Sequence, residues 1–333
     1  MVRPMSRRCL QALLLATALG LSACGAAKED KAPNQAATLL LDFQPNAVHT
    51  GIYTAVARGY DDALGVNLDI RVPSDSTDAV KLLVSRRARL AILDIHDLAI
   101  ARERGRDLVG VMAIVQQPLA AILALPSVKT PRDLEGRRVG VTGLPSDDAV
   151  LRSIVSGSGG DASRTRPTTI GFTAVRSLLT GRVAAATGFW NVEGVALRAR
   201  RPQIREFRVE DYGAPAYPEL VLTVTRETLQ DEPGIVRATV AALARGYAEV
   251  LTDPESAVST LVGSTRGLDR ASVQREFDAV SPAFTSGARA FGELHPGRLR
   301  AWARWEQRFG IVRRRPEVAL AFDGRYVPSG NRD

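Results

Sequence analysis

The chain has 333 residues, of which 45% are hydrophobic and 24% are charged. This composition is that of an ordinary globular protein of about two domains, and it argues against a disordered, collagen-like or coiled-coil chain. The 44 basic and 36 acidic residues give a net charge of +8, which raises the question of nucleic-acid binding. Two cysteines are too few for a disulfide framework or a cysteine-rich zinc module.

The N-terminal residues have the pattern of a secretion signal. Three arginines precede an uncharged, mostly apolar stretch over residues 9–19, which is too short to cross a membrane. The sequence LSAC that follows resembles the bacterial lipobox, whose cysteine becomes the lipidated mature N-terminus. We therefore expect a signal peptide over residues 1–23, lipidation of Cys24, and a flexible tether over residues 24–37 at the outer face of the cell membrane. An ordinary signal peptide without lipidation is the alternative.

Beyond the tether, short apolar stretches alternate with stretches of helical periodicity, and this alternation predicts parallel βαβ units. A break at residues 127–131 separates two such sets. Strands are expected over residues 38–41, 66–72, 90–93, 108–115, 138–142, 184–187, 204–209 and 220–225. Helices are expected over residues 47–58, 78–86, 98–104, 148–155, 174–179 and 191–200, with loops over residues 94–97 and 157–165.

The last third of the chain is expected to be helical. One helix begins near Pro233, because proline is tolerated in a first turn, and another begins at Asp253-Pro254. An apolar and aromatic stripe at helical spacing predicts a buried face rather than a ligand site. Its members are Leu299, Trp302, Trp305 and Phe309.

Common catalytic and metal-binding motifs are missing from the sequence, including G-x-S-x-G, H-E-x-x-H, the Walker loop, G-x-G-x-x-G and C-x-x-C. The three histidines lie far apart, so we predict neither a metal site nor a bound cofactor. Removal of the signal peptide leaves 41 basic and 36 acidic residues, a net charge of +5. The only tight basic run that remains is Arg313-Arg314-Arg315, which is typical of a solvated surface, so nucleic-acid binding is not expected.

Four loops that lead from strands into helices carry polar and aromatic side chains. Helix capping accounts for each loop alone, but ligands of open α/β sheets bind at such strand ends, so the four together predict a cleft. Aromatic rings can sandwich a flat ligand, and carboxylates and amides can pair with ring nitrogens and amino groups. The candidate ligand-binding residues are Phe43, Gln44, Asn46, His49, Tyr53, Asp94, His96, Ser146, Asp147, Trp190, Asn191 and Glu193.

We expect Phe43 and Trp190 to stack on a nitrogen-bearing ring whose edge is read by Asp94, Asn191 and Glu193. Ser146 and Asp147 would hold a ring substituent at a helix start. These loops contain no arginine or lysine, which a sulfonate or nitrate site would be expected to use.

Residues 39–262 resemble the thiamine-pyrimidine-precursor binding family, which comprises solute-binding proteins of bacterial ABC transporters related to the fungal pyrimidine precursor synthase. The stretches that carry the resemblance are LDFQPNAVHTGIYTAVARGY (41–60), DLEGRRVGVTGLPSDDAVL (133–151), LLTGRVAAATGFWNVEGVAL (178–197) and DYGAPAYPEL (211–220). The first of them is shared with sulfonate, nitrate and riboflavin-precursor binders. The resemblance implies a two-lobed periplasmic-binding fold (type II), in which each lobe is a mostly parallel sheet flanked by helices.

We expect residues 38–122 to begin the first lobe, residues 123–218 to form the second, and residues 219–333 to return to the first and add C-terminal helices. Hinges are expected near residues 116–124 and 215–220. The fungal synthase forms a Schiff base through a lysine and consumes a histidine four residues later. His96 aligns with that histidine, but Ile92 stands in place of the lysine, and the cysteine-rich segment of the synthase is missing.

The sequence therefore predicts a monomeric, lipid-anchored solute-binding protein that captures an aminopyrimidine or a related heteroaromatic and delivers it to an ABC permease and ATPase. A riboflavin precursor, a sulfonate or nitrate is the alternative cargo on the same fold. A synthase-like enzyme is a further alternative, which Ile92 disfavours.

Overall fold

The computed structural model describes residues 34–75 and 78–328. The predicted signal peptide, Cys24 and most of the predicted tether lie outside these ranges. The tether prediction was wrong at its C-terminal end, because strand β1 already begins at Gln35 and pairs in parallel with β2 from that residue on. In the part of the chain that is described, no helix has the length and apolar character needed to span a membrane.

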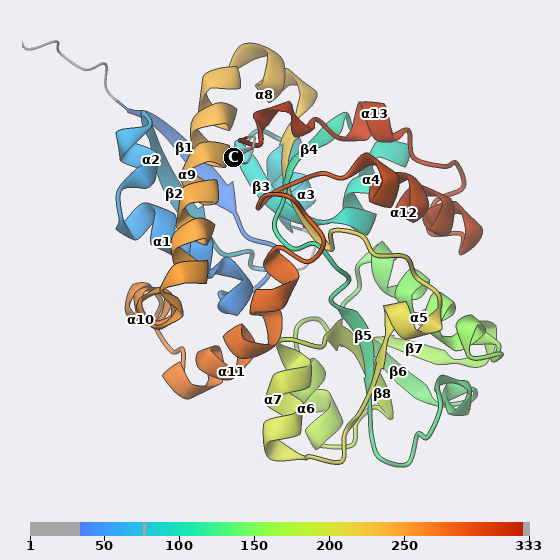
Figure 1. Cartoon of the computed structure of the whole chain (residues 1–333). Helices are drawn as coiled ribbons and strands as arrows, with labels where there is room; N and C mark the ends of the chain where they lie inside the picture. Colours follow the sequence, from blue (N-terminus) through green and yellow to red (C-terminus); the bar gives the residue numbers. More distant parts are fainter. Residues whose placement is uncertain (1–33, 76–77, 329–333) are drawn as a thin grey trace, which may run out of the picture. The chain divides into compact units, whose positions relative to one another are not determined.

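The described chain contains two mixed sheets of five strands, each belonging to one lobe (Figure 1). In each sheet one strand is antiparallel to its two neighbours, which confirms the prediction of mostly parallel sheets. The first sheet, in the order β2-β1-β3-β10-β4, contains β1 (Gln35–Leu40), β2 (Val66–Arg71), β3 (Leu90–Asp94), β4 (Leu108–Ala113) and β10 (Leu220–Thr225). The second, in the order β7-β6-β8-β5-β9, contains β5 (Ala120–Ala124), β6 (Arg138–Val141), β7 (Arg166–Thr169), β8 (Ala185–Phe189) and β9 (Arg205–Arg208).

Helices cover both sheets. Those of the first lobe, with the C-terminal helices, are η1 (Ala47–His49), α1 (Thr50–Ala57), α2 (Tyr60–Ala63), α3 (Asp78–Val84), α4 (Ile95–Glu103), α8 (Arg226–Asp231), α9 (Pro233–Thr252), α10 (Pro254–Ser264), α11 (Arg270–Val280), η5 (Ser281–Phe284), α12 (Pro296–Arg308), α13 (Val318–Ala321) and η6 (Gly324–Tyr326). Those of the second lobe are η2 (Pro131–Leu134), α5 (Pro145–Gly157), η3 (Ala162–Arg164), α6 (Ala174–Leu179), α7 (Glu193–Arg200) and η4 (Val209–Tyr212). Leu299, Trp302 and Trp305 of α12 are buried, as their spacing predicted.

Two strands of the second sheet were not predicted. Strand β5 has the sequence AAILA and lies in the predicted hinge over residues 116–124; its alanines weaken the strand signal, because alanine has a low strand propensity. Strand β7 has the sequence RPTT, is largely exposed and lies at the sheet edge, where proline is tolerated. The predicted lobe boundary at residue 122 falls inside β5, so the first crossing between the sheets is confined to residues 114–119.

The predicted loop over residues 94–97 was also wrong, because α4 begins at Ile95 directly after β3. The Asp94 carboxylate accepts a hydrogen bond from the backbone N–H of His96 at 2.7 Å and so caps the helix. An aspartate at this position satisfies one of the free N–H groups of the first helical turn, which allows the strand to pass into the helix without a loop.

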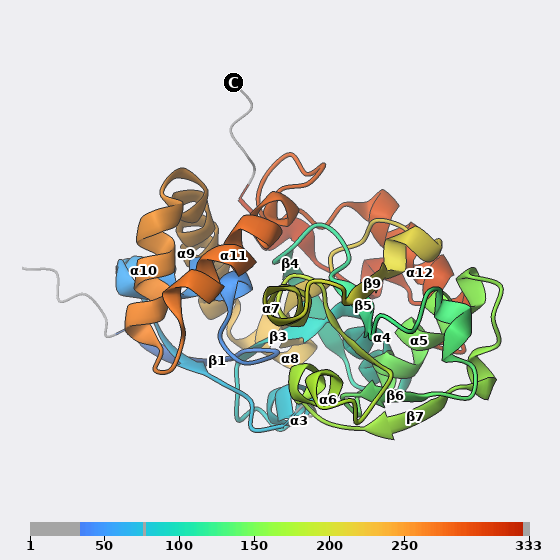
Figure 2. The same ribbon diagram turned by 90° about the horizontal axis from the view of Figure 1, so that it is seen from below.

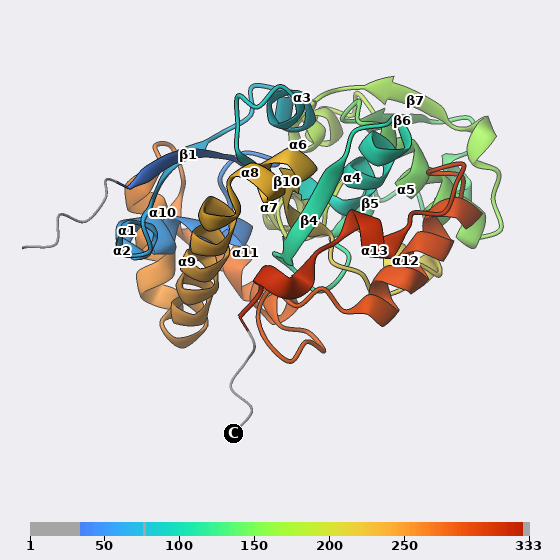
Figure 3. The ribbon, with the colours of Figure 1, turned by 90° about the horizontal axis from the view of Figure 1, so that it is seen from above.

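Helices α1 and α9 pack closely in the first lobe (Figures 1 and 3) because two glycines remove side chains from their contact. A Cβ atom on Gly246 would lie 2.1 Å from the carbonyl oxygen of Gly51. We therefore expect Gly246→Ala to lower the free energy of unfolding by about 1–3 kcal/mol, measured by chemical denaturation. Gly234→Ala in the same helix is the control, because a Cβ there meets no atom within 4 Å. Equal stability of the two variants would contradict the close packing.

Candidate ligand-binding site

A cavity lies between the two lobes, at the carboxyl ends of β1, β3, β6 and β8, the sheet edge where ligands of open α/β folds bind. The volume of the cavity is about 100 Å³, several times the volume that one water molecule requires. Its lining residues are Asp42, Phe43, Ala79, Val80, Ile92, Leu93, Asp94, Asp97, Ala120, Thr142, Leu144, Ser146, Asp147, Val150, Phe172, Thr187, Gly188, Phe189, Glu193 and Leu220.

An aromatic pair from opposite lobes forms part of the wall. Phe43 follows β1 in the first lobe, and Phe172 follows β7 in the second. Their ring centroids are 4.5 Å apart with an interplanar angle of 87°, an edge-to-face contact. Phe189 at the end of β8 is a third aromatic ring of the lining. The cavity therefore has apolar, aromatic surfaces that suit a small flat ligand.

The charged side chains of the lining are all acidic. They are Asp42, Asp94, Asp97, Asp147 and Glu193, and the described lining contains no lysine, arginine or histidine. Burial raises the pKa of Asp94, Asp97, Asp147 and Glu193 above the ordinary values, because desolvation disfavours the charged form. The cavity is therefore built for a ligand that donates hydrogen bonds or carries positive charge.

At the starts of three helices beside the cavity, a carboxyl group of the protein accepts hydrogen bonds from backbone N–H groups. In α5, Oδ2 of Asp147 accepts hydrogen bonds from the backbone N–H groups of Gly143 at 2.9 Å and Leu144 at 3.1 Å. In α4, Asp94 caps the first turn. At α7, Oε2 of Glu193 accepts from the backbone N–H of Phe189 at 3.1 Å. Each of these carboxyl groups is therefore held by backbone N–H groups next to the helix start at which it lies.

His49 positions Asp42 without lining the cavity itself. Its Nδ1 accepts a hydrogen bond from the backbone N–H of Asn46 at 3.2 Å, so the proton of the neutral ring is on Nε2. That nitrogen lies 2.9 Å from Oδ1 of Asp42 and donates to it. The imidazole therefore fixes the orientation of the Asp42 carboxylate at the cavity wall.

The structure brings five of the predicted residues together at the cavity and places seven outside its lining. Those that line it are Phe43, Asp94, Ser146, Asp147 and Glu193. Those that do not are Gln44, Asn46, His49, Tyr53, His96, Trp190 and Asn191.

Several of the seven have other partners. Asn46 caps η1 through its side-chain oxygen, which accepts from the backbone N–H of Val48 at 2.9 Å. The Trp190 indole N–H donates to the Pro118 carbonyl at 3.0 Å. The guanidinium of Arg208 lies 4.1 Å from the centroid of the Trp190 ring. Trp190 is therefore held between the first crossing and β9.

Gln44, Tyr53 and Asn191 also lie outside the lining, and they differ in how deeply they are buried. Gln44 is exposed, and its backbone carbonyl accepts from the side-chain amide of Asn46 at 2.9 Å. Tyr53 is partly buried and packs against the hydrophobic core. Asn191 is fully buried, and neither its side-chain nitrogen nor its oxygen has a hydrogen-bond partner within the described ranges.

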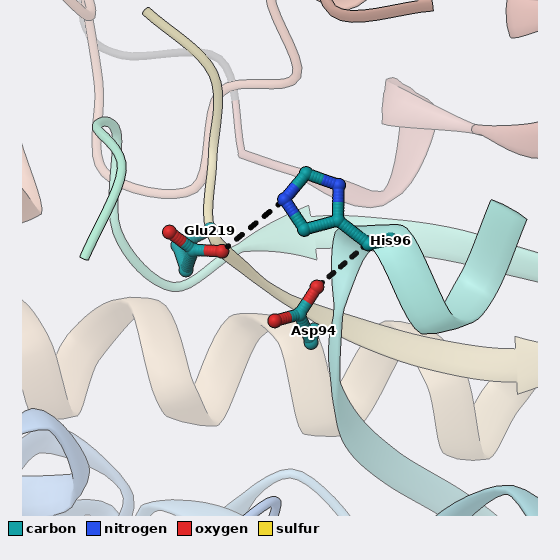
Figure 4. A group of neighbouring side chains, drawn as sticks. All are labelled: Asp94, His96 and Glu219. Atoms are coloured by element: carbon teal, nitrogen blue, oxygen red, sulfur yellow. Dashed lines mark hydrogen bonds and ion pairs between the residues drawn. The ribbon is translucent and has the colours of Figure 1, made fainter. Parts of the chain in front are cut away.

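His96 belongs to a buried polar network at the second crossing (Figure 4). Its Nδ1 donates to the Glu306 carboxylate, and its Nε2 lies 3.1 Å from the Tyr217 hydroxyl and 3.6 Å from Oε1 of Glu219. Although burial alone would lower the pKa of His96, the charges of Glu306 and Asp94 raise it to about 10. The imidazole is therefore a buried cation that holds α4, the crossing and α12 together.

Asp94, His96 and Glu219 each offer a ligand atom, and these atoms lie within 4.8 Å of one another, as a metal site would require. Each residue nevertheless has protein partners. Asp94 caps α4, and Oε2 of Glu219 accepts from the backbone N–H groups of Leu119 at 2.5 Å and Ala120 at 2.9 Å. The network is thus explained by its role in joining the two crossings.

Sequence reasoning missed several lining residues. Asp42 directly precedes Phe43 and could have been found from its place after the first strand. Asp97 lies in the first turn of α4, where the sequence predicted a loop. Phe172 follows a strand that was not predicted. The remaining polar lining residues, Thr142 and Thr187, donate to Asp147 at 2.7 Å each and carry no distinctive sequence signal.

The fold is that of periplasmic binding proteins. The alkanesulfonate-binding protein SsuA of Xanthomonas axonopodis superposes with a TM-score of 0.70 at 16% identity, covering 88% of this chain and 100% of that one. The nitrate-binding protein NrtA of Synechocystis gives a TM-score of 0.66 at 10% identity, covering 88% and 86% of the two chains. Both likenesses concern the fold alone.

The sequence relatives give the family. The formylaminopyrimidine-binding protein of Halalkalibacterium halodurans is 32% identical over 254 residues, which cover 75% of this chain and 77% of that protein. Residues 46–257 match the family described as NMT1/THI5 like. The chain therefore belongs to the NMT1/THI5-like family.

Proposed function

We propose that the protein is a solute-binding protein that captures a small nitrogen-bearing heteroaromatic, namely an aminopyrimidine of the hydroxymethyl or formylaminomethyl type. The observation that carries this proposal is the cavity whose charged lining groups are five carboxylates beside an aromatic pair. The formylaminopyrimidine-binding relative supports the same ligand class.

A carboxyl group suits the edge of an aminopyrimidine. The ring nitrogen and the neighbouring amino group present an acceptor and a donor side by side, and a carboxyl can pair with both. Because burial raises the pKa of Glu193, this group can serve either as a proton donor to the ring nitrogen or as a carboxylate partner of the protonated ring. Glu193 is therefore the residue that we assign to the ring edge.

An anionic cargo suits this site poorly. Sulfonates and nitrate are bound by arginine, lysine or free helix N-termini. The described lining has no basic side chain, and the carboxyl groups of Asp94, Asp147 and Glu193 lie at the starts of α4, α5 and α7. An anion would therefore be desolvated in the cavity without a cationic partner.

A synthase-like enzyme is the second candidate, because the family includes such proteins. Ile92 lines the cavity where the synthase lysine is expected to lie, and an aliphatic side chain cannot form a Schiff base. The appearance of an imine absorption band on mixing the protein with pyridoxal phosphate would overturn the binding-protein proposal in favour of this candidate.

We further propose that the protein is exported, is anchored through Cys24 at the outer face of the membrane, and delivers its ligand to an ABC permease and ATPase. The signal-like N-terminus and the LSAC sequence support the export and the anchor. The periplasmic-binding fold supports the delivery, because two lobes joined by two crossings can close over a solute and release it.

The test is isothermal titration against a panel of ligands. We expect binding of 4-amino-5-hydroxymethyl-2-methylpyrimidine or its formylaminomethyl analogue, and much weaker binding of the matched 4-oxo pyrimidine, which lacks the amino group. Glu193→Gln should weaken the binding of the aminopyrimidine by about tenfold to a hundredfold, because a charge-assisted hydrogen bond contributes roughly 1.5–3 kcal/mol.

The matched control is Glu255→Gln on α10, where the side chain is 87% exposed and far from the lining. This variant should bind like the unchanged protein. Binding of taurine, nitrate or riboflavin in place of every pyrimidine would refute the proposed cargo, and an unchanged affinity of Glu193→Gln would refute the role of Glu193.

A further inference from the structure

The carboxyl groups that line the cavity differ in how many hydrogen bonds they accept from the protein itself. An ionised carboxyl group offers about four acceptor positions. Asp147 receives four donors, namely the Thr187 hydroxyl on Oδ1 and, on Oδ2, the Thr142 hydroxyl and the backbone N–H groups of Gly143 and Leu144. Asp147 therefore has no acceptor position left for a ligand.

Two carboxyl groups of the first lobe also have donors of the protein beside them. Oδ1 of Asp94 accepts a hydrogen bond from the backbone N–H of His96 at 2.7 Å, and the carboxyl group lies next to the buried imidazole (Figure 4). Oδ1 of Asp42 lies 2.9 Å from Nε2 of His49. The orientations of Asp94 and Asp42 are therefore fixed by the fold.

Asp97 has neither a backbone donor nor a cation bound to it. It lies in the first turn of α4, lines the cavity and is only 8% exposed. In residues 34–75 and 78–328 no backbone N–H donates to its carboxyl group, and the ion pairs of the nearby His96 go to glutamates. Burial and the charge of Asp94 raise the pKa of Asp97 well above its ordinary value. The acceptor positions of Asp97 are therefore the least occupied by the protein.

Asp97 is placed where a ligand held by the second lobe can reach it. Helix α4 of the first lobe packs against α5 of the second (Figure 2), and Asp97 and Ser146 line the cavity from the first turns of these two helices. Glu193, at the start of α7, lines the same cavity. Because the volume of the cavity is only about 100 Å³, a small ring bound at Glu193 brings its substituents close to the other polar lining groups.

We propose that Asp97 is a specificity-determining residue, whose carboxyl group accepts a hydrogen bond from a donor on the ring substituent of the ligand while Glu193 binds the ring edge. The ligand class is thereby narrowed to aminopyrimidines whose substituent carries an O–H or N–H group. This inference rests on the proposed function, and it gives Asp97 the role that the sequence predicted for Asp147.

The same geometry selects against ligands that lack the donor. A ring with a methyl group in place of the hydroxymethyl group would exclude water from Asp97 and offer no hydrogen bond in return. A buried polar group without a partner costs more than an ordinary hydrogen bond contributes. A site built around such a group therefore discriminates strongly against the analogue that cannot pair with it.

The test compares two pyrimidines by isothermal titration. They are 4-amino-5-hydroxymethyl-2-methylpyrimidine and 4-amino-2,5-dimethylpyrimidine, which share the ring and its amino group and differ only in the hydroxyl. We expect the unchanged protein to prefer the hydroxymethyl compound by about tenfold to a hundredfold. Glu193→Gln should weaken both compounds by the same factor, because both present the same ring edge.

Variants of Asp97 should act on the preference itself. Asp97→Ala should bind the two pyrimidines with nearly equal affinity, because the acceptor is removed. Asp97→Asn preserves the size of the side chain and one acceptor oxygen, so its preference should be smaller than that of the unchanged protein and larger than that of Asp97→Ala. Thermal melting checks that each variant is folded, and Asp97→Asn carries the test if alanine destabilises the fold.

Two aspartates on α5 provide the comparison. Asp147→Ala should lower the melting temperature, because it removes the acceptor of two backbone N–H groups, but the ratio of the two affinities should stay that of the unchanged protein. Asp148 is exposed and lies outside the lining, so Asp148→Ala should bind like the unchanged protein.

The outcomes separate this inference from the proposed function. A full preference for the hydroxymethyl compound in folded Asp97→Ala or Asp97→Asn, or a preference lost in Asp147→Ala instead, would overturn the role of Asp97 and leave the proposed function standing. If the unchanged protein binds neither pyrimidine, the proposed function fails and this inference fails with it.

Discussion

Replacement of His96 by leucine is expected to lower the free energy of unfolding by about 3–5 kcal/mol, the cost of removing one partner from a buried ion pair. His96 is fully buried and donates to Glu306, which is also fully buried. Oε1 of Glu219 lies 3.6 Å from Nε2 of His96. Leucine would leave both carboxylates in the interior with no cation beside them.

The contribution of His96 depends on pH in a predictable direction. Its pKa is raised from 6.5 to about 10 in the folded protein. The stabilisation is therefore fully present below about pH 6.5 and is lost as the pH rises toward 10. Burial also raises the pKa values of Glu219 and Glu306, so ionising these groups at higher pH acts in the same direction. Urea denaturation at several pH values should show stability falling from pH 6.5 to pH 10.

A double variant provides the control for this experiment. If the loss in His96→Leu comes from stranded carboxylates, His96→Leu combined with Glu306→Leu should be more stable than the sum of the two single losses predicts. Additive losses, or a loss below about 1 kcal/mol in His96→Leu, would show that the network contributes packing rather than charge compensation.

Replacement of Phe172 by alanine is expected to weaken binding of the aminopyrimidine about thirtyfold to a hundredfold. The ring lines the cavity and meets Phe43 of the other lobe edge to face at 4.5 Å. An aromatic pair contributes about 0.5–1.5 kcal/mol beyond its buried area, and burial of the ring itself adds about 1.5 kcal/mol or more. Both terms exist only when the lobes are together, so they favour the ligand-bound form.

Isothermal titration with the ligand identified by the panel measures this effect. The control is Phe309→Ala, a half-buried ring that lies 5.5 Å from Trp305 and does not line the cavity. That variant is expected to lose stability but to keep its affinity for the ligand. An affinity of Phe172→Ala equal to that of the unchanged protein would contradict the role of the aromatic pair in holding the lobes together.

The sequence alone was sufficient to predict features that are determined by residues close to one another along the chain. The alternation of apolar and amphipathic stretches located eight of the ten strands and predicted the mostly parallel sheets. The polar residues at the helix starts were also identified, because an N-cap acts within a few residues of itself. Asp94 and Asp147 were predicted as ligand-binding residues because they lie between a strand and a helix, and both line the cavity.

The tertiary structure decided which of those polar and aromatic side chains meet. Trp190 and His96 satisfy the same local pattern as Phe43 and Asp94, yet Trp190 packs under Arg208 and His96 pairs with Glu306, 210 residues away in sequence. Asp42, Asp97 and Phe172 reach the cavity because sheets and helices from two lobes converge there. The direction of a side chain beyond a strand end depends on the elements that cover it, and those contacts come from distant parts of the chain.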